Sequence, residues 1–124
     1  MAKILYVEDN DDNIYMLKRW LKRKGHEVLI AENGADGVEV AEQEMPDLIL
    51  MDLNLPIMDG WTATTKIKEN EKTANIPVIA LSAHAMSEHR ERALNSGADD
   101  YDTKPVDVDR LLSKMGKFLE YVIV

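Results

Sequence analysis

The 124-residue chain contains no cysteine. This absence excludes disulfide bonds, thiolate zinc sites and a cysteine nucleophile, and it is compatible with a reducing compartment. Long apolar runs are missing as well, since none approaches the roughly 20 residues that a membrane-spanning helix needs. The amino-terminal segment enters an apolar run at once and lacks the small-residue cleavage site of a signal peptide. We therefore expect a cytoplasmic protein that does not enter a membrane.

Basic residues are in the minority, with 15 lysines and arginines against 23 acidic residues and a net charge of −8. Such a charge repels nucleic-acid phosphates, so direct binding to nucleic acid is not expected and a protein partner is favoured. The length suits one domain over residues 1–124. No linker, low-complexity segment or block of like charge divides the chain.

Short apolar runs alternate with helical patterns. The runs are uninterrupted, which is typical of strands covered on both faces. Gly25 is placed to end the first helix, and Asp107 to begin the last one. The expected strands are 4–7, 28–31, 48–51, 77–81 and, with a weaker pattern, 99–101. The expected helices are 12–24, a helix from Asn33 that Pro46 stops, 60–69, 86–95, and a final helix whose apolar stripe ends at Leu119.

Five strands alternating with five helices predict an α/β fold, with a parallel sheet and helices on both faces. Polar residues stand at or just past the end of the apolar runs, and in a parallel sheet such ends converge on one edge. Three carboxylates, a hydroxyl and a lysine at that edge suit a divalent cation and a phosphoryl group. These residues are Glu8 with Asp9, Asp52 with Asn54, Ser82 with Ala83, Tyr101, and Lys104 with Pro105.

Magnesium is the cation that the pattern favours. Asp9 and Asp52 would end the first and third strands, which are neighbours in the flavodoxin-like order 2-1-3-4-5. Their carboxylates repel each other unless a hard cation lies between them, and Mg²⁺ needs few protein carboxylates. Zinc has no cysteine here and only three scattered histidines. Asp52 would accept the phosphoryl group as an acyl phosphate, with Lys104 and Ser82 supplying a cation and a hydroxyl.

Several segments resemble the receiver domain of two-component response regulators, in particular the single-domain, chemotaxis-regulator-like type. The similarity runs from about Lys3 to about Leu119. It implies a flavodoxin-like (βα)5 fold and a signalling switch that takes a phosphoryl group from a histidine kinase or a histidine phosphotransfer protein. The segments that carry it are ILYVEDN at 4–10, LILMDLNLP at 48–56, MDG at 58–60, IALSA at 79–83, GADDY at 97–101 and KP at 104–105.

The resemblance implies a role for each residue at the edge. Asp52 is implied as the phosphoacceptor and as a metal ligand. Asp9 is implied as a direct Mg²⁺ ligand, Glu8 as a ligand through water, and Asn54 as the third protein ligand through its main-chain carbonyl. Two positions depart from the commonest pattern of the family, because Asp is frequent where this chain has Glu8 and Thr where it has Ser82.

The remaining implied roles concern the phosphoryl group and the response to it. Ser82 is at the hydroxyl position that closes on the phosphoryl group, and Lys104 is at the lysine that pairs with it. Tyr101 is at the aromatic switch, and Pro105 falls where the family has a cis peptide bond. Asn54 and His84 occupy the two positions that influence the lifetime of the phosphoryl group.

Phosphorylation should draw Ser82 toward the phosphoryl group and rotate Tyr101 inward. The surface expected to respond runs from Met86 to Phe118. A downstream protein target, or a second copy of the chain in a homodimer, would bind to this face.

Other readings compete with this one. An aspartate at a strand end is often only a turn or cap residue. The acidic segment after Glu8 fails the EF-hand pattern, because the required Gly and Glu would be Ile14 and Trp20. A magnesium-dependent phosphohydrolase would use Asp52 as a transient nucleophile, yet Asn54 stands where a general acid is needed. A constitutive interaction module that takes no phosphate is a further alternative.

Overall fold

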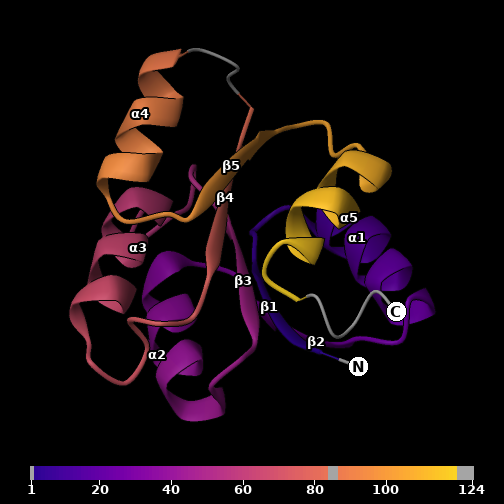
Figure 1. The fold of residues 1–124 in the computed structure, drawn as a ribbon, viewed down its shortest axis with the longest axis horizontal. Coiled ribbons are helices and arrows are strands. Elements are labelled where there is room, and N and C mark those ends of the chain that lie inside the picture. The colour runs from indigo at the N-terminus through magenta and orange to yellow at the C-terminus, as the bar shows by residue number, and fades with distance from the viewer. Residues whose placement is uncertain (1, 84–86, 120–124) are drawn as a thin grey trace.

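The five strands form one parallel sheet (Figure 1). The computed structural model describes residues 2–83 and 87–119. The order is β2-β1-β3-β4-β5, and each neighbouring pair is parallel. The flavodoxin-like order expected from the sequence is therefore confirmed. The strands are β1 (Lys3–Val7), β2 (Glu27–Ala31), β3 (Leu48–Asp52), β4 (Val78–Ser82) and β5 (Asp100–Thr103).

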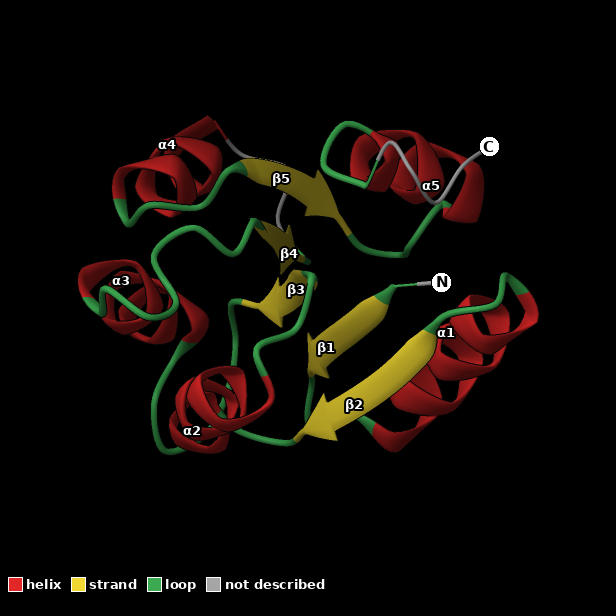
Figure 2. Ribbon diagram, turned by 60° about the horizontal axis from the view of Figure 1, so that its bottom comes forward, coloured by secondary structure: helices red, strands yellow, loops and turns green. Residues whose placement is uncertain are grey.

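Helices cover both faces of the sheet (Figure 2). One face carries α1 (Asp11–Arg23) and α5 (Val108–Gly116). The other carries α2 (Gly34–Glu44), α3 (Gly60–Glu69) and α4 (Ser87–Asn95). Within the described part of the chain, no helix is long and apolar enough to span a membrane.

Alternating side chains of each strand build a separate core on each face of the sheet. Tyr6 of β1 packs in one core with Leu17 of α1 and Leu111 of α5. Leu5, its neighbour on the strand, packs in the other core with Ala63 of α3. Because both faces are covered, the strands carry apolar residues at consecutive positions, which explains the uninterrupted runs in the sequence.

Local capping sets the helix ends. Gly25 follows α1 with a φ of 89°, the left-handed conformation that the sequence predicted for it. Met45, with a φ of 47°, ends α2 directly before Pro46. Four helices start at a side chain that accepts a hydrogen bond from the N–H three residues further on. These caps are Asn10, Asn33, Asp59 and, as expected, Asp107.

The fifth strand differs from the expected 99–101. Asp99 lies before the strand, and its side chain accepts hydrogen bonds from the Val78 N–H and from Lys68 Nζ, each at 2.8 Å. The strand continues to Thr103. The expectation that Tyr101 stands at or past the end of its run is therefore wrong, since Tyr101 is the second residue of β5.

The end of the last helix also differs from the sequence expectation, and the expected start of α4 lies outside the described residues. The described part of α4 begins at Ser87, and Met86 lies outside the described residues, as does His84. The last helix ends at Gly116, and Phe118 lies in the turn that follows it. Leu119 is nevertheless buried in the same core as α1 and α5. The apolar stripe thus extends beyond the end of α5, which is why periodicity alone placed the end of this helix too late.

Candidate functional site

The carboxyl ends of four strands meet at one edge of the sheet. Asp52 is the last residue of β3, and Ser82 is the last residue of β4. Glu8 and Asp9 directly follow β1, and Lys104 directly follows β5. Because all the strands are parallel, residues far apart in the chain come to the same edge.

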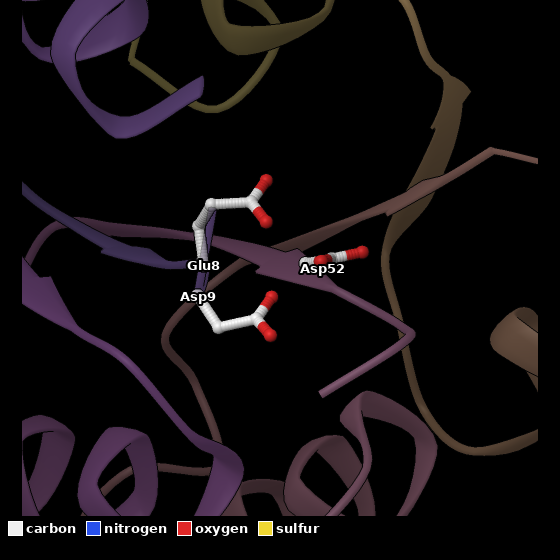
Figure 3. A group of neighbouring side chains, drawn as sticks. All are labelled: Glu8, Asp9 and Asp52. Carbon is white, nitrogen blue, oxygen red and sulfur yellow. The ribbon is translucent and has the colours of Figure 1, made fainter. Parts of the chain in front are cut away.

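Glu8, Asp9 and Asp52 form a cluster of three carboxylates at this edge (Figure 3). One oxygen atom of each lies within 4.8 Å of the others. Glu8 and Asp52 are buried, whereas Asp9 is exposed, so the cluster reaches solvent on the Asp9 side. Hard oxygen donors at this spacing are what Mg²⁺ prefers, so the residues present fit this ion.

The Glu8 carboxylate is held by several donors. Its Oε1 accepts from the Tyr6 hydroxyl at 2.9 Å and from Lys104 Nζ at 2.5 Å, and its Oε2 accepts a long bond of 3.4 Å from the Asn10 N–H. Burial alone would raise the pKa of Glu8, but hydrogen bonds from Lys104 and from the protonated Asp52 carboxyl hold the pKa below its ordinary value. Burial raises the pKa of Tyr6, so its hydroxyl remains a donor.

The Asp52 carboxylate has the opposite shift. Its Oδ2 lies 3.3 Å from Lys104 Nζ, and its Oδ1 accepts from the Asn54 N–H at 3.3 Å. Burial and the neighbouring Glu8 raise the pKa of Asp52 from 3.8 to about 7, against the attraction of Lys104. The two buried carboxylates therefore repel each other when both are ionised, and a bound cation would relieve this repulsion.

The raised pKa of Asp52 predicts how the stability of the metal-free protein depends on pH. Between about pH 4 and pH 7 the folded chain binds more protons at Asp52 than the unfolded chain, so the contribution of this group to the free energy of unfolding falls as the pH rises. A pKa raised from 3.8 to about 7 corresponds to an effect on the order of a few kcal/mol. Asp52→Asn has no buried carboxyl group to ionise at this position. It should therefore be more stable than the parent protein at pH 8 and lose this advantage toward pH 4.

Denaturant unfolding of both proteins in EDTA, from about pH 4 to about pH 8, measures this difference. Comparing the two proteins cancels the contribution of His26. Burial lowers the pKa of His26, so its own effect on stability has the opposite sign in this range. An advantage of Asp52→Asn that does not grow with pH would show that the Asp52 pKa is not raised.

Ser82 and Lys104 are joined through the backbone. Ser82 is fully buried at the end of β4. Its carbonyl accepts a hydrogen bond of 2.7 Å from the Lys104 N–H. The Lys104–Pro105 peptide bond is cis. The strand end that carries the hydroxyl and the loop that carries the lysine are therefore held side by side.

Tyr101 lies outside the carboxylate cluster. It pairs in register with Ala80 of β4, and its side chain is 6% exposed. The ring packs in a small core with Leu53, Ala93 and Ala98. The side chain thus already occupies an inward position in this structure.

The loop after Asp52 depends on Gly60. The Gly60 N–H donates to the Leu53 carbonyl at 3.0 Å. A Cβ atom at this position would lie 2.2 Å from the Asp52 carbonyl oxygen and 2.7 Å from Leu53 Cα. Only glycine fits such a close approach. The MDG segment therefore fixes the backbone that follows Asp52.

Sequence reasoning missed two contacts of buried carboxylates. Tyr6 was not singled out, although residues two apart on a strand point to the same face, so its hydroxyl was placed to reach Glu8. Asp102 was also missed, and its carboxylate accepts from Arg110 Nε at 2.7 Å. Nothing in the polar sequence of β5 marks Asp102 as buried, because its burial depends on how α5 packs.

The fold and the site together define a class of α/β protein that binds a divalent cation and a phosphoryl group at the carboxyl edge of a flavodoxin-like sheet. Within this class the chain belongs to the family of response regulator receiver domains, which it matches over residues 4–116. Receiver domains are the phosphoacceptor signalling switches of two-component systems, and they interact with histidine kinases and downstream targets.

Individual proteins support the family assignment. Protein PilH of Pseudomonas aeruginosa is 41% identical over 96% of this chain and 98% of its own length. The polar-differentiation response regulator DivK of Brucella anthropi is 34% identical, over 94% of each chain. The solved receiver domain of the sensor histidine kinase PA1611 from Pseudomonas aeruginosa superimposes with a TM-score of 0.90 at 35% identity, covering 96% of this chain and 98% of that one. That structure has a magnesium ion coordinated in its active-site cleft.

Proposed function

We propose that Asp52 accepts a phosphoryl group from a phosphohistidine on a histidine kinase or a histidine phosphotransfer protein. The observation that carries this proposal is the position of its carboxylate, which is buried at the end of β3 within 3.3 Å of Lys104 Nζ and next to Glu8. An Asp52 oxygen attacks phosphorus, the P–O bond forms, and the P–N bond breaks with its electron pair leaving on the imidazole. Loss of the covalent adduct in Asp52→Asn tests the proposal.

Lys104 and Ser82 assist this transfer. Charge on the peripheral oxygens of the transferred group is stabilised by a lysine and by hydroxyl or amide donors. Lys104 already lies at Asp52, so it can pair with the group once it is attached. Ser82 ends the neighbouring strand and supplies a hydroxyl from the α4 side of the site.

Magnesium is the proposed cofactor. Asp9 and Asp52 would hold it directly, with the Asn54 main-chain carbonyl as the third protein ligand and Glu8 acting through water. Bound there, the ion supplies positive charge to the acceptor and to the phosphoryl oxygens. The carboxylate cluster of this chain and the magnesium-containing cleft of the PA1611 receiver domain support this choice.

The chain is proposed to be a substrate that assists its own phosphorylation and dephosphorylation, not an enzyme that turns over a separate substrate. Asn54, two residues after the acceptor, and His84, outside the described residues, are proposed to tune the lifetime of the acyl phosphate. We also propose that residues 1–124 work as one receiver domain in the cytoplasm, where a histidine kinase has ATP available for its own phosphorylation.

The output is proposed to pass through α4, β5 and α5, the described part of the face from Met86 to Phe118. Ser82 ends the strand that precedes α4 in the chain, and Tyr101 of β5 packs with Ala93 of α4. Arg92 of α4 stacks on the Trp61 ring of α3, with 3.9 Å from its guanidinium carbon to the ring centre. A shift of α4 would therefore disturb contacts on both of its sides and alter the surface offered to a target or to a second copy of the chain.

A beryllofluoride complex, which imitates the phosphoryl group, should change amide NMR shifts across α4, β5 and α5 as well as at the carboxylate cluster. The reason is that Ser82 moves toward the bound group, which shifts a pre-existing equilibrium between two conformations of this face. The same addition to Asp52→Asn is the control, and it should change little. Shifts confined to the cluster, with no change in self-association, would refute this output surface.

A further inference from the structure

Tyr6 is a buried residue of the site to which the proposed function assigns no role. It belongs to β1, is fully buried, and faces the core shared with α1 and α5. Its hydroxyl lies 2.9 Å from Glu8 Oε1. Because residues 6 and 8 are two apart along the same extended segment, the ring and the carboxylate lie on the same side of the sheet.

Glu8 Oε1 has two donors, Tyr6 and Lys104, and they differ in mobility. The Tyr6 ring is packed in the core and its hydroxyl cannot leave without disturbing that packing. The Lys104 side chain is 17% exposed and also lies 3.3 Å from Asp52. An arriving phosphoryl group competes with Glu8 for the lysine, and the tyrosine is then the fixed donor that remains.

A glutamate needs such a fixed donor more than an aspartate would. Its carboxylate is one methylene further from the backbone, so one more torsion must be held for the oxygens to point at the neighbouring carboxylates. The backbone contact to the second oxygen, Oε2, is the long 3.4 Å hydrogen bond from the Asn10 N–H. The orientation of the Glu8 carboxylate is thus set mainly through Oε1.

We propose that Tyr6 is a positioning residue, whose hydroxyl keeps the Glu8 carboxylate oriented toward the metal site, together with Lys104 before phosphorylation and alone once Lys104 turns to the phosphoryl group. This inference rests on the proposed magnesium site. Outer partners that hold a metal ligand by a hydrogen bond raise affinity by fixing its orientation. A tyrosine that merely filled the core would contribute to folding without affecting magnesium affinity.

The test is a titration with MgCl2 alone, followed by amide NMR shifts at the site, on Tyr6→Phe. The variant keeps the ring and removes only the hydroxyl. Its magnesium affinity should be weaker by up to about tenfold, because tenfold is the lower end of the cost of losing a partner of a direct ligand and Glu8 acts through water. Tyr15→Phe is the matched control, because Tyr15 is 67% exposed on α1 and should bind magnesium like the parent.

The Glu8→Asp variant, used as a second parent protein, distinguishes a positioning role of Tyr6 from a packing role. In Glu8→Asp the shorter side chain withdraws the carboxylate from Tyr6, so adding Tyr6→Phe should change the magnesium affinity only within about twofold. An equal loss in both backgrounds, or an unchanged affinity of Tyr6→Phe, would overturn the role of Tyr6 while leaving the magnesium site intact. No binding to the parent protein would overturn the site and the role of Tyr6 together.

The parent protein offers a measurement that does not depend on a variant folding. The side-chain Cζ resonance of Tyr6 reports on its hydroxyl hydrogen bond, and it should move during the magnesium titration while that of Tyr15 stays in place. A Tyr6 resonance that does not respond as magnesium saturates the site would contradict the proposal.

Discussion

Asp52→Asn should abolish the phosphoryl adduct that the parent protein forms with acetyl phosphate and magnesium. The amide nitrogen and oxygen of asparagine cannot form an acyl phosphate, and no other carboxylate of the cluster ends a strand beside Lys104. Intact-protein mass spectrometry measures the adduct as a gain of one phosphoryl group. We expect the parent to show this gain and the variant to show none.

Asp12→Asn is the matched control for this experiment. Asp12 is an exposed carboxylate in the first turn of α1, close in sequence to Glu8 and Asp9. Its substitution also removes one negative charge, so a loss caused merely by charge would appear in both variants. An adduct that persists in Asp52→Asn would show that another residue accepts the phosphoryl group.

Removal of magnesium should stop phosphorylation of the parent protein as completely as the substitution does. Without a cation, the Glu8 and Asp52 carboxylates repel each other, and an incoming phosphate adds more negative charge to the same edge. Acetyl phosphate in EDTA should therefore give no adduct, and excess MgCl2 should restore it. The affinity of the protein for Mg²⁺ should be modest, because the ion keeps several waters and only a few protein ligands are present.

The metal experiment has its own internal comparison. Asp9→Asn removes a proposed direct ligand and should require more magnesium for the same extent of phosphorylation, whereas Asp12→Asn should follow the parent curve. Full phosphorylation in EDTA would contradict the metal site even if Asp52 is the acceptor. The two parts of the proposed chemistry can thus fail separately.

The sheet and the edge that carries the site could be predicted because they depend on patterns that are local in sequence. Uninterrupted apolar runs marked the strands, and polar residues at their ends marked where the functional side chains would gather. Asp52 and Ser82 are indeed the last residues of β3 and β4, and Lys104 follows β5 directly. The cap at Asp107 and the left-handed Gly25 likewise depend on adjacent residues alone.

Features that depend on tertiary contacts could not be predicted in the same way. Tyr101 lies inside β5 because the strand continues to Thr103, which pairs with Ser82 of the neighbouring β4. The shift of the Asp52 pKa toward neutrality requires its burial and its distance from Glu8. Neither quantity appears in the sequence.

The central claim is that Asp52 takes a phosphoryl group from a P–N bond. Phosphoramidate provides such a bond in a small donor, and borohydride reduction of an aspartyl phosphate leaves homoserine, which peptide mass spectrometry can locate. We predict that treatment with phosphoramidate and magnesium, followed by borohydride, places homoserine at position 52 alone. Homoserine at position 9 or elsewhere, or no homoserine at all, would contradict the account.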